Sequence, residues 1–185
     1  MGNKKRVILG SGNTYVVEYT GNTLPTDEEI EIEANLLGAT SGGASFEYSQ
    51  EKYTAKSDDG KITKTITTDE SVKFKTGIMT IIAENLKKLV STGRTSSASN
   101  KTTLKIGGVS NDDGKLYIVR FVHKDSADGD VRLTIIGKNQ SGLTFSFAKD
   151  KETVVDAEFT AESMDDEGTL IQLDFFDPVT EPTGE

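Results

Sequence analysis

The sequence has 185 residues and a mass of 20.0 kDa, enough for one domain with a buried core. Its 30 acidic and 21 basic residues give a net charge of −9, which argues against binding nucleic acid through clustered cations. The absence of cysteine excludes a disulfide scaffold, a cysteine nucleophile and cysteine-ligated metal sites. No run approaches the roughly 18 apolar residues of a membrane helix.

The first clear pattern lies at residues 29–36, where apolar and acidic residues alternate. This period of two predicts a strand with one buried face and one acidic face. The apolar positions are Ile30, Ile32, Ala34 and Leu36, and the acidic positions are Glu29, Glu31 and Glu33.

Residues 41–68 predict a long β-hairpin with a thin apolar face. The segment begins with Ser-Gly-Gly, turns at Asp59-Gly60 and returns through a threonine-rich stretch. An isolated two-stranded ribbon is only marginally stable in water. We therefore expect an arm that docks on another subunit and is disordered in the isolated monomer. The alternative is an ordinary hairpin that packs on the core of its own chain.

The next segment departs from strand periodicity. Apolar residues at 78, 82, 86, 89 and 90 form one helical stripe, which predicts a helix over 77–91 that packs across the sheet. Thr76 or Thr80 is expected to cap its start, and Gly93 follows its end. Residues 91–103 lack large apolar side chains and predict a flexible loop.

The second half predicts further antiparallel strands. The nearly continuous apolar run 116–122 indicates a central strand covered on both faces. Alternation predicts strands at 143–147, 155–161 and 171–175. Hairpin turns are expected at Asp113-Gly114, Asp128-Gly129, Ser141-Gly142 and, more weakly, Glu167-Gly168. The pattern predicts a mainly-β sandwich or barrel in one domain over 1–177, followed by a flexible tail at 178–185.

The sequence contains no constellation typical of catalysis. His123 is the single histidine, and no Gly-x-Ser-x-Gly elbow accompanies it, so we interpret it as a strand-end or interface residue. The acidic clusters at 125–130 and 165–167 lack the spacing of an EF-hand and are interpreted as solvated turns. We therefore expect neither enzyme activity nor a metal ion or cofactor.

The order of these features resembles the tail tube, or major tail, proteins of tailed bacteriophages. Three segments carry the resemblance: residues 39–48 (Ala-Thr-Ser-Gly-Gly-Ala-Ser-Phe-Glu-Tyr), the arm to Thr68, and residues 74–86 (Phe-Lys-Thr-Gly-Ile-Met-Thr-Ile-Ile-Ala-Glu-Asn-Leu). The likeness spans about residues 10–177 and is an overall pattern rather than a short motif.

The resemblance implies a protomer that forms hexameric rings, stacked into a tube through which double-stranded DNA leaves the capsid without specific binding. It also implies a virion tail location after assembly in the bacterial cytoplasm, with tape measure, tail terminator and baseplate or tail-tip proteins as partners. The arm residues expected to contact the next ring are Tyr48, Glu51, Lys52, Tyr53, Lys56 and Asp58. Glu29, Glu31 and Glu33 are candidates for an acidic lumen wall.

Two other function classes remain open from the sequence. One is a different β-module of a virion, such as a capsid decoration or adhesion domain, which would bind a lattice or glycan without polymerising. The other is an enzyme whose site has no recognisable sequence pattern.

Overall fold

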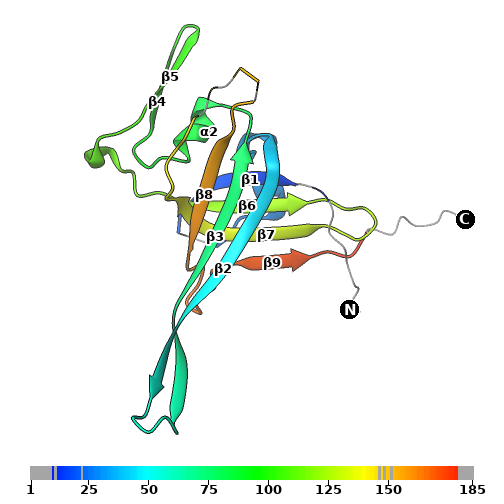
Figure 1. Ribbon diagram of the computed structural model, residues 1–185. Coiled ribbons are helices and arrows are strands. Elements are labelled where there is room, and N and C mark those ends of the chain that lie inside the picture. Colours follow the sequence, from blue (N-terminus) through cyan, green and yellow to red (C-terminus); the bar gives the residue numbers. More distant parts are fainter. Residues whose placement is uncertain are drawn as a thin grey trace, which may run out of the picture.

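The computed structural model describes residues 10, 12–21, 23–145, 147, 149–150 and 152–178, and the fold is mainly β (Figure 1). All pairs of named strands are antiparallel. In chain order the elements are β1 (Asn13–Tyr19), α1 (Asp27–Ile30), the 3-10 turn η1 (Glu33–Asn35), β2 (Thr40–Lys56), β3 (Thr63–Ile78), α2 (Ala83–Lys87), β4 (Arg94–Ala98), β5 (Lys101–Lys105), the 3-10 turn η2 (Val109–Asn111), β6 (Leu116–His123), β7 (Val131–Asn139), β8 (Val155–Glu162) and β9 (Gln172–Phe175).

The main sheet folds over itself because β7 has different neighbours along its length. The strand order is β1-β6-β7-β8-β3-β2, and β9 also pairs with β7. The first half of β7 pairs with β9, and its second half pairs with β8. Strands β8, β3 and β2 therefore cross over the layer of β1, β6, β7 and β9 (Figure 1). At the crossing, a Cβ on Gly137 would lie 2.0 Å from the carbonyl oxygen of Thr160, so β8 approaches β7 too closely for a side chain.

The main core fills the space between these two layers. It is built from residues on β1, β3, β6, β7 and β8, and it is closed by Leu86 and Leu89 in and just after α2. A smaller core lies on the other face of β6, where Ile118 and Val122 pack with Ile30 of α1. Both faces of β6 are thus buried, which confirms the predicted central strand. The strand prediction at 155–161 is also confirmed, since Val155, Ala157 and Phe159 of β8 are buried.

The strand predicted at 29–36 is wrong. This segment forms α1 and η1 instead, and it covers the outer face of the β1-β6-β7 layer. Ile30 is buried but Ile32 is 47% exposed, so the alternation does not mark one buried face. The backbone N–H of Thr26 donates to the carboxylate of Glu29 at 2.9 Å, which favours a helical turn at this point.

The helix predicted over 77–91 is shorter and begins later. Strand β3 continues to Ile78, and α2 starts only at Ala83, with Ile82 at its N-cap. Thr76 and Thr80 do not cap it, because Thr76 lies in β3 and the hydroxyl of Thr80 accepts from the Ala39 N–H. The prediction that the apolar stripe packs on the sheet is only partly correct. Leu86 and Leu89 reach the core, whereas Ile82 is about half exposed.

The flexible loop predicted at 91–103 is also wrong, because β4 and β5 form a hairpin there. The strand predicted near the C-terminus is present as β9, although Leu173 and Phe175 are 40% and 59% exposed. The described residues of 143–147 carry no strand. The predicted tail at 178–185 lies outside the described residues except for Pro178.

Glycines at the predicted turns adopt positive φ, as the turn chemistry requires. The φ values of Gly60, Gly129 and Gly142 are 70°, 87° and 74°. Asp59-Gly60 and Asp128-Gly129 lie in hairpins, between β2 and β3 and between β6 and β7. The other predicted hairpin turns differ: Asp113-Gly114 joins η2 to β6, Ser141-Gly142 begins the long connection from β7 to β8, and Glu167-Gly168 lies between β8 and β9, which are not paired with each other in the described sheets. Among the described residues, no helix has the length and apolar character needed to cross a membrane.

Candidate functional site

The most distinctive surface is the arm, which we define as residues 49–71 of the β2–β3 hairpin. Near the body β3 pairs with β8, but only from Lys73 to Ile78. From Ser49 and Ser71 outward, β2 and β3 pair only with each other in the described sheets. The arm consequently projects away from the sandwich, at the bottom of Figure 1. Its residues 49–70 are exposed apart from half-buried Ser57.

The arm carries apolar side chains that its own chain does not cover. Tyr53 and Ile66 lie directly opposite each other and are 61% and 48% exposed. Ile62, beside the tip, is 72% exposed. A cross-strand aromatic–β-branched pair contributes some stability to a ribbon, but large apolar side chains left this exposed are also available to a partner. Ile62 and Ile66 were not among the predicted contact residues, although their spacing in the sequence is that of one strand face.

The tip of the arm is a hydrogen-bonded turn. The Ser57 N–H donates to the Ile62 carbonyl at 2.9 Å, and the Gly60 N–H donates to the Ser57 carbonyl at 2.8 Å. The carboxylate of Asp59 accepts from the Ser57 hydroxyl at 2.6 Å and from the Lys61 N–H at 3.1 Å. These bonds lower the pKa of Asp59, so its charged form holds the turn at neutral pH.

All six predicted contact residues lie on the arm or at its base, and the structure brings them onto one ribbon. Alternation along β2 places Tyr48, Lys52 and Lys56 on one face, and Glu51 and Tyr53 on the other. A β-bulge lies between Glu51 and Lys52. Its extra residue belongs to β3, so the side chains of β2 still alternate between the two faces. Asp58 is in the tip turn. The ribbon therefore presents different contact groups on its two faces.

The base of the arm is fixed by polar pairs. The Tyr48 hydroxyl donates to the Glu70 carboxylate at 2.9 Å, and this bond raises the pKa of Tyr48. On the outer face of the sheet, Glu158 of β8 pairs with Lys73 at 3.0 Å and with Lys75 at 3.2 Å. The two ammonium groups, Lys73 first, lower the pKa of Glu158. These pairs connect β2 to β3 and β3 to β8 at the place where the arm leaves the sheet.

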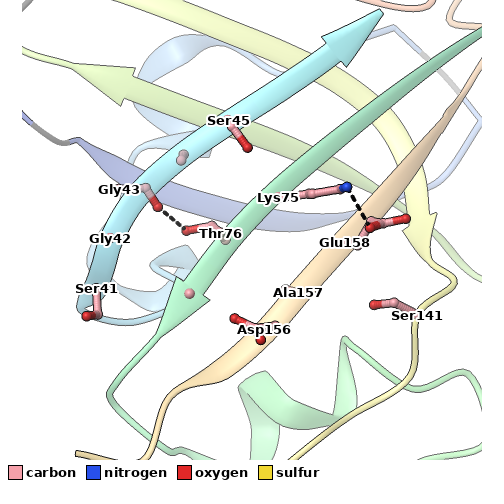
Figure 2. A pocket seen from close by; sticks show the side chains of 12 residues that line it. Ser41, Gly42, Gly43, Ser45, Lys75, Thr76, Ser141, Asp156, Ala157 and Glu158 are labelled. Carbon is pink, nitrogen blue, oxygen red and sulfur yellow. Dashed lines mark hydrogen bonds and ion pairs between the residues drawn. The ribbon is translucent and has the colours of Figure 1, made fainter. Parts of the chain in front are cut away.

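Above the base, the sheet surface is hollowed at a second β-bulge (Figure 2). The hollow has a volume of about 460 Å³ and is lined mostly by small residues of β2, β3 and β8, together with Ser141 and the charged side chains of Lys75, Asp156 and Glu158. Gly42 and Gly43 both have φ of 76°, and the Gly43 carbonyl accepts from the Thr76 hydroxyl at 3.3 Å. The one ammonium group in the lining, Lys75, is already paired with Glu158. The hollow is therefore large enough to hold a segment of polypeptide, and its ammonium group is not free for chemistry.

Glu29, Glu31 and Glu33 do not form the acidic strand face from which they were predicted to line a lumen. Since the segment is helical, their side chains do not share one strand face. The carboxylate of Glu31 is largely buried and accepts from Arg132 at 2.5 and 3.2 Å, while Glu29 bonds to the backbone of Thr26. Glu33 is exposed.

The other residues singled out from the sequence have structural surroundings. His123 is buried at the end of β6. The carboxylate of Asp125 accepts from the backbone N–H groups of Ala127 and Asp128, and that of Asp165 accepts from Glu167 and Thr169. The pKa of Asp165 is lowered by these bonds, Thr169 first. Within the described residues, no group of three or more histidine, aspartate or glutamate side chains is arranged to hold a metal ion.

The comparisons with known proteins give no relative to guide an assignment. No protein-family model matches the chain, and the comparison with curated proteins found no match.

Proposed function

We propose that this protein is a structural subunit of a bacteriophage tail tube. Copies would form hexameric rings that stack into a hollow tube, with double-stranded DNA passing through an electronegative bore. One observation carries the proposal: the arm is a long exposed ribbon whose outer part pairs with no other strand of the described sheets. A second copy would supply the surface that such a ribbon needs for stability.

Charge supports the same proposal. The chain carries −9, yet the arm contains five acidic and four lysine residues and so has a net charge of only −1. Most of the negative charge therefore belongs to the rest of the chain, and the arm adds little repulsion when it approaches another copy. A negatively charged tube wall would repel the DNA phosphates, so the passing duplex would find no site that binds it.

Electron microscopy of the concentrated protein tests the proposal. The expected result is rings or tubes of uniform diameter. A protein that stays monomeric at high concentration and in the presence of nucleating tail components would overturn the proposal. Binding to a preformed capsid lattice or to glycans, without self-polymerisation, would favour a decoration or adhesion module instead.

A shortened variant tests the arm itself. Ser49 and Ser71 are opposite each other, so residues 50–70 can be replaced by Asn-Gly, which favours a two-residue hairpin turn. Since Val72 and Phe74 stay in the core, the melting temperature should change little. The variant is expected to remain folded and to lose stacking. Tubes that still form from it would show that the arm is not the stacking contact.

A further inference from the structure

A separate apolar cavity lies between the two layers of the sandwich, at the edge where β2 faces β9. We call it the socket. It has a volume of about 270 Å³, and its lining residues are Ala44, Ser45, Phe46, Phe74, Phe121, His123, Val131, Leu133, Leu173 and Phe175. Its rim consists of large apolar side chains: Phe46, Leu173 and Phe175 are 47%, 40% and 59% exposed. Cavities of about 150 Å³ lined by apolar residues already hold a benzene ring, so an aromatic side chain fits the socket by size.

A matching exposed group lies on the connection between β7 and β8. Phe145 and Phe147 stack with ring centroids 6.1 Å apart and an interplanar angle of 3°. Phe147 is 83% exposed and Phe145 is 37% exposed. A stacked aromatic pair left in water at this exposure is typical of an interface anchor. We call these two residues the plug.

The plug does not fill the socket of its own chain, since neither phenylalanine is among the socket's lining residues. Val131, at the start of β7, lines the socket, whereas the plug follows Asn139, at the end of the same strand. Eight residue steps of a β-strand span roughly 26 Å. Strand β7 therefore leads the chain away from the socket before the plug begins.

Charge selects the plug over the arm as the occupant. Residues 141–147 contain no charged side chain, so they can enter an apolar site without desolvating a charge. The apolar residues of the arm are interspersed with Lys52, Lys56, Lys61 and Lys64. We propose that the socket of one copy receives the Phe145–Phe147 plug of a second copy.

The contact joins two different surfaces, so it is heterologous and propagates from copy to copy. It deepens the proposed function, because it rests on self-association of this chain and adds a contact that does not involve the arm.

Crosslinking tests the contact, and the lack of cysteine makes the test clean. One protein carries Ala44→Cys at the socket and another carries Thr144→Cys beside the plug, so that both phenylalanines and the large apolar side chains of the lining are kept. A short bismaleimide is added to the mixture of the two full-length proteins. The expected result is a crosslinked heterodimer in excess of either homodimer. A Val109→Cys protein, altered at a residue that is 92% exposed and outside the socket lining, replaces the Thr144→Cys protein as the control.

Adding Phe147→Ser to the Thr144→Cys protein should reduce the crosslink to the level of the control. If the Thr144→Cys protein with Phe147 intact gives no more crosslinked heterodimer than the Val109→Cys control, the proposal is overturned. The micrographs keep the two proposals separate. Tubes without the crosslink would reject the socket contact and leave the tail-tube function standing. The crosslink without rings or tubes would reject the tail-tube function and leave the contact standing.

Discussion

At the scale of single residues, the most consequential feature is the charged cluster under α1. Arg120 projects from the middle of β6 and is 3% exposed. Its guanidinium donates to the Thr134 hydroxyl at 3.0 Å and pairs with Asp27, and Glu31 lies 3.7 Å away. Arg132 of β7 pairs with the same two carboxylates, and its hydrogen bonds to Glu31 raise the pKa of Arg132. The cluster attaches α1 to the sheet.

Removing one partner from this cluster should destabilise the protein. Arg120→Ala would leave Asp27 and Glu31 with Arg132 as their remaining cation in the cluster. Since Asp27 is 39% exposed, the loss should exceed about 1 kcal/mol but stay below the roughly 3–5 kcal/mol of a fully buried pair. The measurement is the free energy of unfolding in urea. Arg94→Ala, at an exposed residue of β4, is the matched control and should change that energy by less than about 0.5 kcal/mol. Equal effects of the two substitutions would show that the cluster contributes no specific stability.

At the scale of elements, the alternation of apolar and polar residues predicted the strands of the sandwich correctly. It gave a wrong prediction where polar and charged interactions determine the local structure. The arm, β6 and β8 follow their sequence patterns closely. At 29–36, the helical turn is favoured by the bond from Thr26 to Glu29 and by the pairs of Glu31 with two arginines more than 85 residues away. The Thr-x-x-Glu spacing was a local signal for that turn, but the distant arginines could not be assigned from one sequence.

The hairpin of β4 and β5 was not predicted, and the reason is different. It lacks a substantial apolar face, so hydrophobic periodicity gives no signal, and its threonine content was the remaining indication of strand. The socket and the plug were missed for a third reason. The sequence predicted strands around Phe147 and Phe175, but it does not show which apolar strand residues lack a covering layer.

The arm and its base should differ in amide exchange although they belong to the same two strands. Amides within residues 50–69 have one neighbouring strand and no core above them, whereas those of 72–78 have β8 and the core. We expect the first group to exchange rapidly in the monomer and the second group to be protected. Exchange measured by mass spectrometry checks this, and assembly should slow the first group. Equal protection of both groups in the monomer would show that the arm is stable without a partner.

At the scale of the whole molecule, assembly has to overcome mutual repulsion. Each copy carries −9, whereas the arm carries only −1 and the two plug residues are uncharged. The contacts therefore gain little from electrostatic attraction, while the bodies repel each other through solvent. Such repulsion is screened by salt, since the Debye length falls from about 10 Å at 0.1 M to about 3 Å at 1 M.

Raising the salt concentration from about 0.1 M to about 1 M should therefore lower the protein concentration at which polymer appears. Sedimentation of the assembled fraction measures that concentration, and micrographs identify the polymer. A matched variant with Glu28→Gln, Glu33→Gln and Glu167→Gln removes three exposed negative charges from the body. It should assemble at lower protein concentration in 0.1 M salt and respond less to added salt, because less repulsion remains to be screened. Polymer that dissolves as salt rises would instead show that ion pairs, rather than the apolar contacts of the arm and the plug, hold the copies together.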